Sequence, residues 1–282
     1  MNTLSTKTNR DKYRSASLDE ALRVGLVSEA IFEVDRGDAK TIQSPYQSTP
    51  TVVVQGLAGT YTPAAFTTTD DTLTVTDEFI VGEHIFDFEE TLSKFDLFSS
   101  RQDVTNYAVT QKIDQFVLNV ITEEATGAYT TAAGGFSAAN VNKIMGDLGE
   151  KVMGFADLYK GLFLVIENTD ASGFTQAQMA NGFSFADAAL KNGFMSNYGG
   201  IDIYVVRSGT FSDATQGTKT WSNAGHRVFG VKNVATYAAP RGIKFEEKGV
   251  SGKTGKELVT FGYIGAKLWA PKAGLIVDIT LA

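Results

Sequence analysis

Residues 100–124 read SRQDVTNYAVTQKIDQFVLNVITEE, and this stretch decides the fold because it is the clearest helix in the sequence. Ser100 is a typical helix N-cap residue, and Asp103 places negative charge in the first turn, where it is favoured. Apolar residues then recur every three or four positions, as on one face of a helix: Val109, Ile113, Phe116, Val117 and Val120. A helix from Arg101 to Glu124 would be about 36 Å long. We expect it to act as the backbone of the molecule with its apolar stripe buried.

The segment before this helix, from Lys40 to about Asp87, has the composition of β-strands. Thr51–Val54, Thr72–Thr76 and Phe79–Val81 are rich in β-branched residues. The chain between the first two is small and rich in threonine, so we interpret it as a long two-stranded excursion. Its apolar content is too low for a core of its own, and an isolated hairpin has only marginal stability in water. We therefore expect it to pack against another surface.

The N-terminal part is predicted to be an arm followed by a short helix. Residues 1–16 are mostly polar and charged and have little to bury. The pattern S-x-x-E at Ser17–Glu20 is a capping box. Apolar residues recur from there to Ile31, which predicts an amphipathic helix interrupted by Gly25.

Beyond the long helix, helical and strand patterns alternate. A second helix is expected from Ser137 to Val152, followed by a buried strand at Leu162–Ile166 and short helices at Thr175–Ala180 and Phe185–Leu190. The remaining strands, with glycine-containing turns, are predicted at residues 201–206, 228–234, 243–247, 258–269 and 275–281. The chain is therefore predicted to have an α+β fold without internal repeats.

The composition excludes several classes of function. The chain has 282 residues, enough for one or two domains, and its 25 basic and 32 acidic side chains give a net charge of −7. It has no cysteine, which removes disulfides and thiolate chemistry. No apolar run approaches a membrane span and the N-terminus lacks a signal-peptide core, which indicates a soluble protein made inside the cell. The acidic balance argues against a surface that coats nucleic acid.

No catalytic or cofactor-binding constellation is visible, so we expect a non-enzymatic protein without cofactor or metal. Gly252–Thr254 resembles the end of a phosphate-binding loop, but the upstream glycine is missing and a hairpin turn is favoured. His84 and His226 are far apart in the sequence and are expected to be structural, and Trp221 and Trp269 are expected to be packing residues.

Paired carboxylates are the remaining candidates for chemistry. Such pairs serve in glycoside hydrolysis or calcium binding, but none here has the spacing of a calcium loop. A solvated face or a protected strand edge is the favoured explanation for all of them: Asp70–Asp71, Asp77–Glu78 and Asp87 with Glu89–Glu90.

Two parts of the chain are difficult to explain in a monomer, namely the basic arm and the projecting hairpin. Neighbouring copies would cover both of them, and an exposed strand edge is otherwise an aggregation hazard. The residues expected to contact other copies come from these two parts: Lys7, Arg10, Lys12, Arg14, Tyr61, Phe66, Asp70 and Asp71.

The order of these elements resembles the major capsid protein of tailed bacteriophages, which has the Hong Kong phage capsid fold. The resemblance is carried by the arm, the long hairpin, the helix around Gln111–Asp114, the strand at Gly161–Glu167 and the run YGGIDIYVV at Tyr198–Val206. The ending TFGYIGAKLWAP at Thr260–Pro271 is similar to the close of this family, where the chain returns to the peripheral domain.

This resemblance implies a division into five parts. These are an N-terminal arm (1–39), an extended loop (40–87), a peripheral domain with the spine helix (88–125), an axial domain (126–235) and the C-terminal strands of the peripheral domain (236–282). It also implies that copies form pentamers and hexamers of an icosahedral shell, which encloses double-stranded DNA without binding it tightly. The protein would be made in the host cytoplasm and reside in the virion.

The implied partners follow from the same resemblance. The arm is too short to contain a scaffolding domain, so a separate scaffolding protein is implied, with a portal protein and a decoration protein as further partners. Some members join subunits through a lysine in the extended loop, but no lysine occurs from Thr41 to Glu90, so a non-covalent shell is expected. An encapsulin-like nanocompartment of the same fold is the alternative, and a β-rich hydrolase or adhesin is the alternative from another class.

Overall fold

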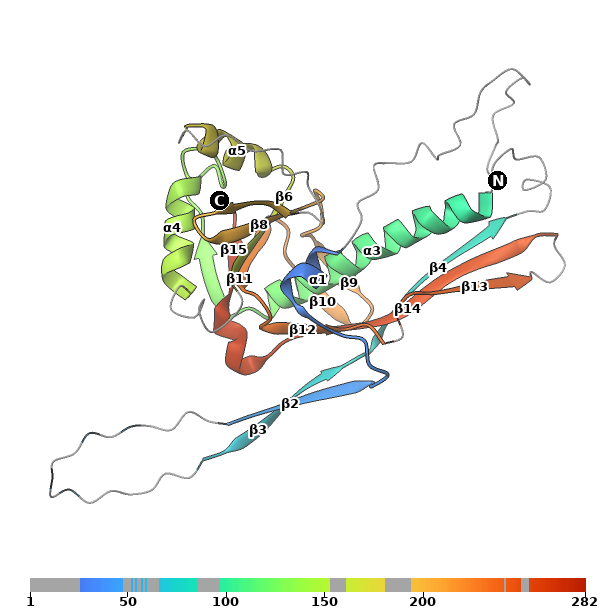
Figure 1. Ribbon diagram of the computed structural model, residues 1–282, viewed down its shortest axis with the longest axis horizontal. Coiled ribbons are helices and arrows are strands. Elements are labelled where there is room, and N and C mark those ends of the chain that lie inside the picture. Colours follow the sequence, from blue (N-terminus) through green and yellow to red (C-terminus); the bar gives the residue numbers. More distant parts are fainter. Residues whose placement is uncertain are drawn as a thin grey trace.

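The computed structural model describes residues 26–47, 52, 54, 57, 59, 66–85, 97–152, 161–180, 194–240, 242–249 and 254–282. Two large sheets, one long helix and a projecting hairpin are the main features of this part of the chain (Figure 1). The molecule is α+β, as the sequence predicts.

The long helix, α3, extends from Leu97 to Glu123. It begins before the expected start at Arg101, because Leu97 and Phe98 are compatible with helical backbone and Ser100 lies within the helix rather than at its cap. The predicted apolar stripe is buried in the main core, with no member more than 5% exposed: Val109, Ile113, Phe116, Val117 and Val120. The ring of Phe116 meets that of Trp221 edge to face, with centroids 5.8 Å apart.

A six-stranded mixed sheet forms one end of the molecule (Figure 1). Its order is β5 (Gly127–Thr130), β15 (Ile276–Thr280), β11 (His226–Val231), β6 (Leu162–Glu167), β8 (Ile201–Val206) and β7 (Phe194–Tyr198). Every residue of β6 is buried, as expected for a strand covered on both faces. Helices α4 (Val141–Val152) and α5 (Ala171–Ala180) lie beside this sheet.

The second sheet is built around the long strand β14 (Lys256–Leu268). Its order is β1 (Glu33–Asp35), β12 (Ala235–Ala238), β14 and β13 (Lys244–Gly249), and β4 (Asp77–Ile85) pairs with β14. Strands β13 and β14 are antiparallel neighbours on either side of Gly252–Thr254, which agrees with a hairpin connection there. In Figure 1, α3 runs along this sheet.

The projecting hairpin consists of β2 (Thr41–Gln47) and β3 (Thr68–Thr74) (Figure 1). The predicted two-stranded excursion therefore exists, but the strand that pairs with β3 is β2 rather than Thr51–Val54, which falls largely outside the described residues. The sequence of β2, TIQSPYQ, has few β-branched residues and contains Pro45, which explains why composition alone does not reveal it.

Three small elements complete the described structure. Helix α1 (Val27–Ile31) lies against α3, the ribbon β9 (Asp213–Gln216) and β10 (Lys219–Ser222) forms a separate hairpin, and the 3-10 helix η2 (Ala270–Leu275) follows β14. The predicted helix at Phe185–Leu190 and the residues from Ser17 to Gly25 lie outside the described residues.

Candidate intersubunit surfaces

The hairpin is fixed to the body of the molecule by Asp71. One carboxylate oxygen, Oδ1, lies 2.8 Å from Nζ of Lys267, and the other accepts a hydrogen bond of 2.8 Å from the backbone N–H of Ala270. Burial by itself raises the pKa of Asp71, but the N–H of Ala270 and the Lys267 ammonium outweigh it, so the pKa lies below its ordinary value. Leu73 and Val75 pack against Trp269 beside this ion pair.

Asp71 therefore makes its contacts within its own chain, whereas the sequence predicts that it contacts another copy. Only 9% of it is exposed, and its carboxylate is used within the chain. The neighbouring Asp70 is exposed and forms no ion pair within the described residues. Phe66 is 72% exposed, whereas Tyr61 and the arm residues lie outside the described residues: Lys7, Arg10, Lys12 and Arg14.

A second buried carboxylate, Asp77, connects the start of β4 to the β9–β10 turn. It accepts hydrogen bonds from the N–H and the hydroxyl of Thr218, at 2.5 and 3.0 Å, and from the hydroxyl of Thr76 at 3.0 Å. Gly217 has φ +58°, and a Cβ there would lie 2.1 Å from Oδ1 of Asp77, so only glycine fits this turn. The expectation of a solvated face is thus wrong for Asp77, but Glu78 is exposed.

Large exposed apolar residues in the described structure fall into two groups. Four belong to the hairpin or its connecting segment, namely Val52, Val54, Leu57 and Phe66. Three belong to the β4–β14–β13 sheet, namely Ile80, Phe245 and Tyr263. The hairpin group lies in a stretch without charged side chains, which extends from Thr41 to Thr69. Such apolar groups far from a core are characteristic of surfaces that another protein covers.

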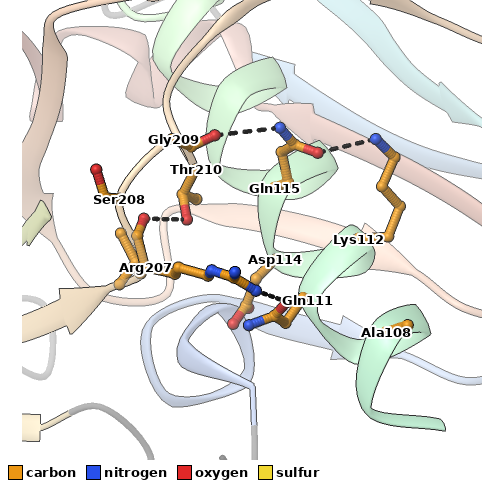
Figure 2. Close-up of a pocket in the computed structure, with 10 residues that line it drawn as sticks. Ala108, Gln111, Lys112, Asp114, Gln115, Arg207, Ser208, Gly209 and Thr210 are labelled. Carbon is orange, nitrogen blue, oxygen red and sulfur yellow. Dashed lines mark hydrogen bonds between the residues drawn. The ribbon is translucent and has the colours of Figure 1, made fainter. Parts of the chain in front are cut away.

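A polar cleft of about 390 Å³ lies between α3 and the loop that follows β8 (Figure 2). Gln115 crosses it, donating to the carbonyl of Gly209 at 3.4 Å and accepting from Lys112 at 2.9 Å. Arg207 donates to Oε1 of Gln111 at 3.3 Å. Burial lowers the pKa of Lys112. These hydrogen bonds connect α3 to the loop that follows β8.

Asp114, on the same helix, holds the start of α1. Its carboxylate accepts hydrogen bonds from the N–H groups of Val27 and Ser28, at 3.1 and 3.0 Å, and from the hydroxyl of Ser28 at 2.7 Å. A carboxylate at the first N–H groups of a helix compensates their missing partners. The N-terminal segment is therefore attached to the middle of α3 at this point.

A buried ionic cluster holds the first sheet together, and sequence reasoning does not find it. Arg227 donates to Oδ2 of Asp170 at 2.6 Å and to Oε2 of Glu167 at 3.2 Å. The other oxygen of Glu167 accepts from the N–H groups of Gly209 and Phe211. Arg227 is far from Glu167 and Asp170 in the sequence, so no local sequence pattern predicts the cluster. Each of the three charged groups has a partner in the cluster, which fits a structural role.

Both tryptophans are buried, and both histidines belong to strands. His84 belongs to β4, and Nδ1 of His226 lies 2.8 Å from a carboxylate oxygen of Asp278 in the neighbouring strand. Trp221 is 2% exposed, and Nε1 of Trp269 donates to the hydroxyl of Thr236 at 2.9 Å.

Neither a metal centre nor a membrane helix emerges from the described part of the chain. The residues placed there contain no group of three or more histidine, aspartate or glutamate side chains that could hold a metal ion. Among the helices described, none is long and apolar enough to cross a bilayer.

Comparison with solved structures identifies the fold. A chain of Mycobacterium phage Che8 superposes with a TM-score of 0.73 at 15% identity, covering 97% of both chains. The capsid of the cyanophage P-SCSP1u gives a TM-score of 0.69 at 14% identity, covering 97% of this chain and 93% of the other. The capsid of an empty GTA particle gives 0.70 at 14% identity, covering 96% and 95%. No family model and no curated protein matches the sequence.

These similarities extend over nearly the whole chain and show that it has the fold of phage capsid proteins. The fold that the order of sequence elements implies is therefore confirmed.

Proposed function

We propose that this chain is the major capsid protein of a tailed phage, a structural subunit without catalytic activity. The single observation that carries the proposal is the likeness to capsid chains over 96–97% of the sequence, hairpin included. The five-part division into arm (1–39), extended loop (40–87), spine-helix segment (88–125), axial domain (126–235) and C-terminal strands (236–282) is part of the proposal.

The exposed apolar residues of the hairpin support self-assembly. Val52, Val54 and Leu57 are 85–113% exposed. Exposure of apolar side chains to water is unfavourable, so their burial against another copy would stabilise an assembly. A contact between the hairpin of one copy and a different surface of the next is heterologous, and repeated heterologous contacts close into rings. Pentamers and hexamers in an icosahedral shell are the assemblies that we propose.

The proposed contents are consistent with the charge of the chain, and the proposed partners are those that the resemblance to phage capsid proteins implies. A net charge of −7 suits a shell that encloses double-stranded DNA without binding it tightly. A separate scaffolding protein, a portal protein and a decoration protein are the proposed partners, and the virion is the proposed location after synthesis in the host cytoplasm.

Analytical sedimentation and electron microscopy of the purified chain test this function. We expect capsomers or large closed particles whose proportion rises with protein concentration, alone or with a scaffolding protein. A chain that remains monomeric at high concentration under both conditions would contradict the proposal. Particles from infected cells should contain DNA, and a cargo enzyme in its place would instead indicate a nanocompartment.

A further inference from the structure

An apolar cleft of about 490 Å³ lies between the middle of α3 and the start of β4. The end of β9, the turn that follows it and β14 complete its walls. The lining includes four side chains of the main core, none more than 5% exposed: Val109, Ile113, Phe116 and Ile264. Concave sites of about 300–1,000 Å³ that are lined mainly by apolar side chains are typical of small-molecule binding.

The two acids of the cleft have roles elsewhere. The carboxylate of Asp77 accepts hydrogen bonds from Thr76 and Thr218. Glu78 follows Asp77 on β4, and successive side chains of a strand point to opposite faces of the sheet. The carboxylate of Glu78 is therefore directed away from the face that α3 covers.

Lys112 is the cation at the rim of the cleft. Its side chain is exposed, and Nζ donates to the neutral amide oxygen of Gln115 at 2.9 Å (Figure 2). Lys112 forms no ion pair in the part of the chain that the structure describes. Partial burial lowers the pKa of Lys112, as expected for an ammonium group without a carboxylate partner. An anionic group at the rim can therefore pair with Lys112 without breaking an existing ion pair.

Apolar walls and one cation at the rim define the chemistry of a ligand. An alkyl chain in the cleft leaves water, which is favourable, and a carboxylate at the end of that chain matches the charge of Lys112. A cleft of this volume holds one small molecule, whereas a stable contact between proteins buries about 800 Å² on each partner. The size of the cleft therefore favours a single amphiphile over another protein chain.

We propose that the cleft between α3 and β4 binds one molecule of a long-chain carboxylate, with its alkyl chain against Ile113 and Phe116 and its carboxylate at Lys112. The inference concerns the single subunit and does not depend on the proposed function. It adds a ligand-binding site to a chain for which we propose a structural role.

Isothermal titration calorimetry of the full-length, unassembled subunit with dodecanoate tests the binding. The titration is carried out below the concentration at which dodecanoate forms micelles. We expect saturable binding of one molecule per subunit, with a negative change in heat capacity because apolar surface is buried. A titration without saturable binding would overturn the inference.

Ala108→Phe tests the location of the site. Ala108 is exposed and lines the cleft one helical turn before Lys112, so a bulky side chain there should fill the cleft and abolish binding. Asn106→Phe, at an exposed position of α3 outside the lining, is the matched control and should bind dodecanoate like the natural chain. Equal affinities of these two variants would place the ligand elsewhere and overturn the inference.

Lys112→Gln tests the charge at the rim. It should weaken the binding of dodecanoate about fivefold, as loss of an exposed ion pair would, and leave the binding of the neutral dodecan-1-ol unchanged. Lys143→Gln, exposed on α4, is the matched control for the lost charge. An unchanged affinity of Lys112→Gln for dodecanoate would refute the inferred pairing. This comparison still decides the matter if thermal melting shows that Ala108→Phe does not fold.

A side chain of a second copy is the competing occupant of the cleft. In that case the natural chain would not bind dodecanoate, and Ala108→Phe would prevent shells. That result would overturn the inference and leave the proposed function intact. Binding of dodecanoate by a chain that never assembles would instead support the inference and contradict the proposed function.

Discussion

At the scale of single residues, adjacent acids have opposite roles. Asp71 and Asp77 are buried and hold the chain together, whereas Asp70 and Glu78, their neighbours, are exposed. Successive side chains on a strand point to opposite faces, so one member of each pair meets the body of the molecule and the other meets solvent. A pair of acids in a strand is therefore not one functional unit.

Asp71→Asn should weaken the attachment of the hairpin. The amide can still accept from Ala270 but loses the ion pair with Lys267, at a cost of about 1–2 kcal/mol in the free energy of unfolding at neutral pH. Because the pKa of Asp71 is lowered in the folded state, its contribution is complete above about pH 4 and is lost as the pH falls through the folded pKa.

Urea unfolding of the unassembled subunit at neutral and acidic pH measures this effect. Asp70→Asn is the matched control, since Asp70 is exposed and should change stability by less than about 0.5 kcal/mol. Equal effects of the two substitutions would contradict the assigned role of Asp71.

Phe116→Ala should lower the stability of the subunit itself. The side chain is 4% exposed and packs on Trp221, so truncation leaves a cavity that costs about 3–5 kcal/mol. Chemical denaturation of the unassembled chain gives the value. Asn106→Ala, on an exposed position of the same helix, serves as control, and an unfolding curve unchanged by Phe116→Ala would show that this stripe does not stabilise the core.

At the scale of elements, the hairpin separates into an anchored base and a tip that the body does not support. Ile42, Leu73 and Val75 belong to a small core with Trp269, but Val52, Val54 and Leu57 touch no core. The base thus belongs to folding of the subunit, and the tip is available for contacts with other copies.

Replacing residues 48–66 with a short Gly/Ser turn should prevent shells without unfolding the subunit. The variant retains β2, β3 and Asp71, so its thermal melting should be nearly unchanged, while particle yield should collapse. Replacement of residues 56–71 instead removes Asp71 and should also lower the melting temperature. Normal shells from the variant that lacks residues 48–66 would show that the tip makes no essential contact.

The elements that the sequence predicts well are those with a strong local period. The 3.6-residue stripe of α3 and the continuous apolar run of β6 both reveal their burial. Strand β2 is missed because Pro45 and polar residues conceal it, and its pairing with β3 depends on register rather than composition. The short strands β9, β10 and β12 have four residues each, too few for a periodic signal.

The candidate surfaces are less predictable than the fold. The hairpin and the arm stand out by their composition, but the burial of Asp71 depends on Lys267, which is distant in the sequence. The same is true of the Arg227 cluster, because Asp170 and Glu167 are about 60 residues from Arg227 in the sequence. Such sites exist only after long-range packing has formed, so no window of the sequence contains them.

At the scale of the whole molecule, one continuous core joins α3, both sheets and α1. The subunit therefore has its own core, and we expect contacts between copies to be added to a folded unit rather than to complete an unfinished one.

Shells of this protein should be held together without covalent bonds. The chain has no cysteine, and no lysine occurs from Thr41 to Glu90, so the hairpin can provide neither a disulfide nor a lysine-derived crosslink. Boiled particles should run as a single band near 30.3 kDa on a denaturing gel. A ladder of multimers would refute this expectation.

The absence of charge from Thr41 to Thr69 has a consequence for how shells respond to ionic strength. Mobile ions screen contacts between charges, but they do not screen the burial of apolar surface. Contacts of the hairpin tip should therefore persist at high ionic strength, or strengthen in sulfate, which favours apolar burial. Contacts between exposed charges weaken under the same conditions, so an increase in salt concentration distinguishes apolar contacts of the hairpin tip from ion pairs between copies.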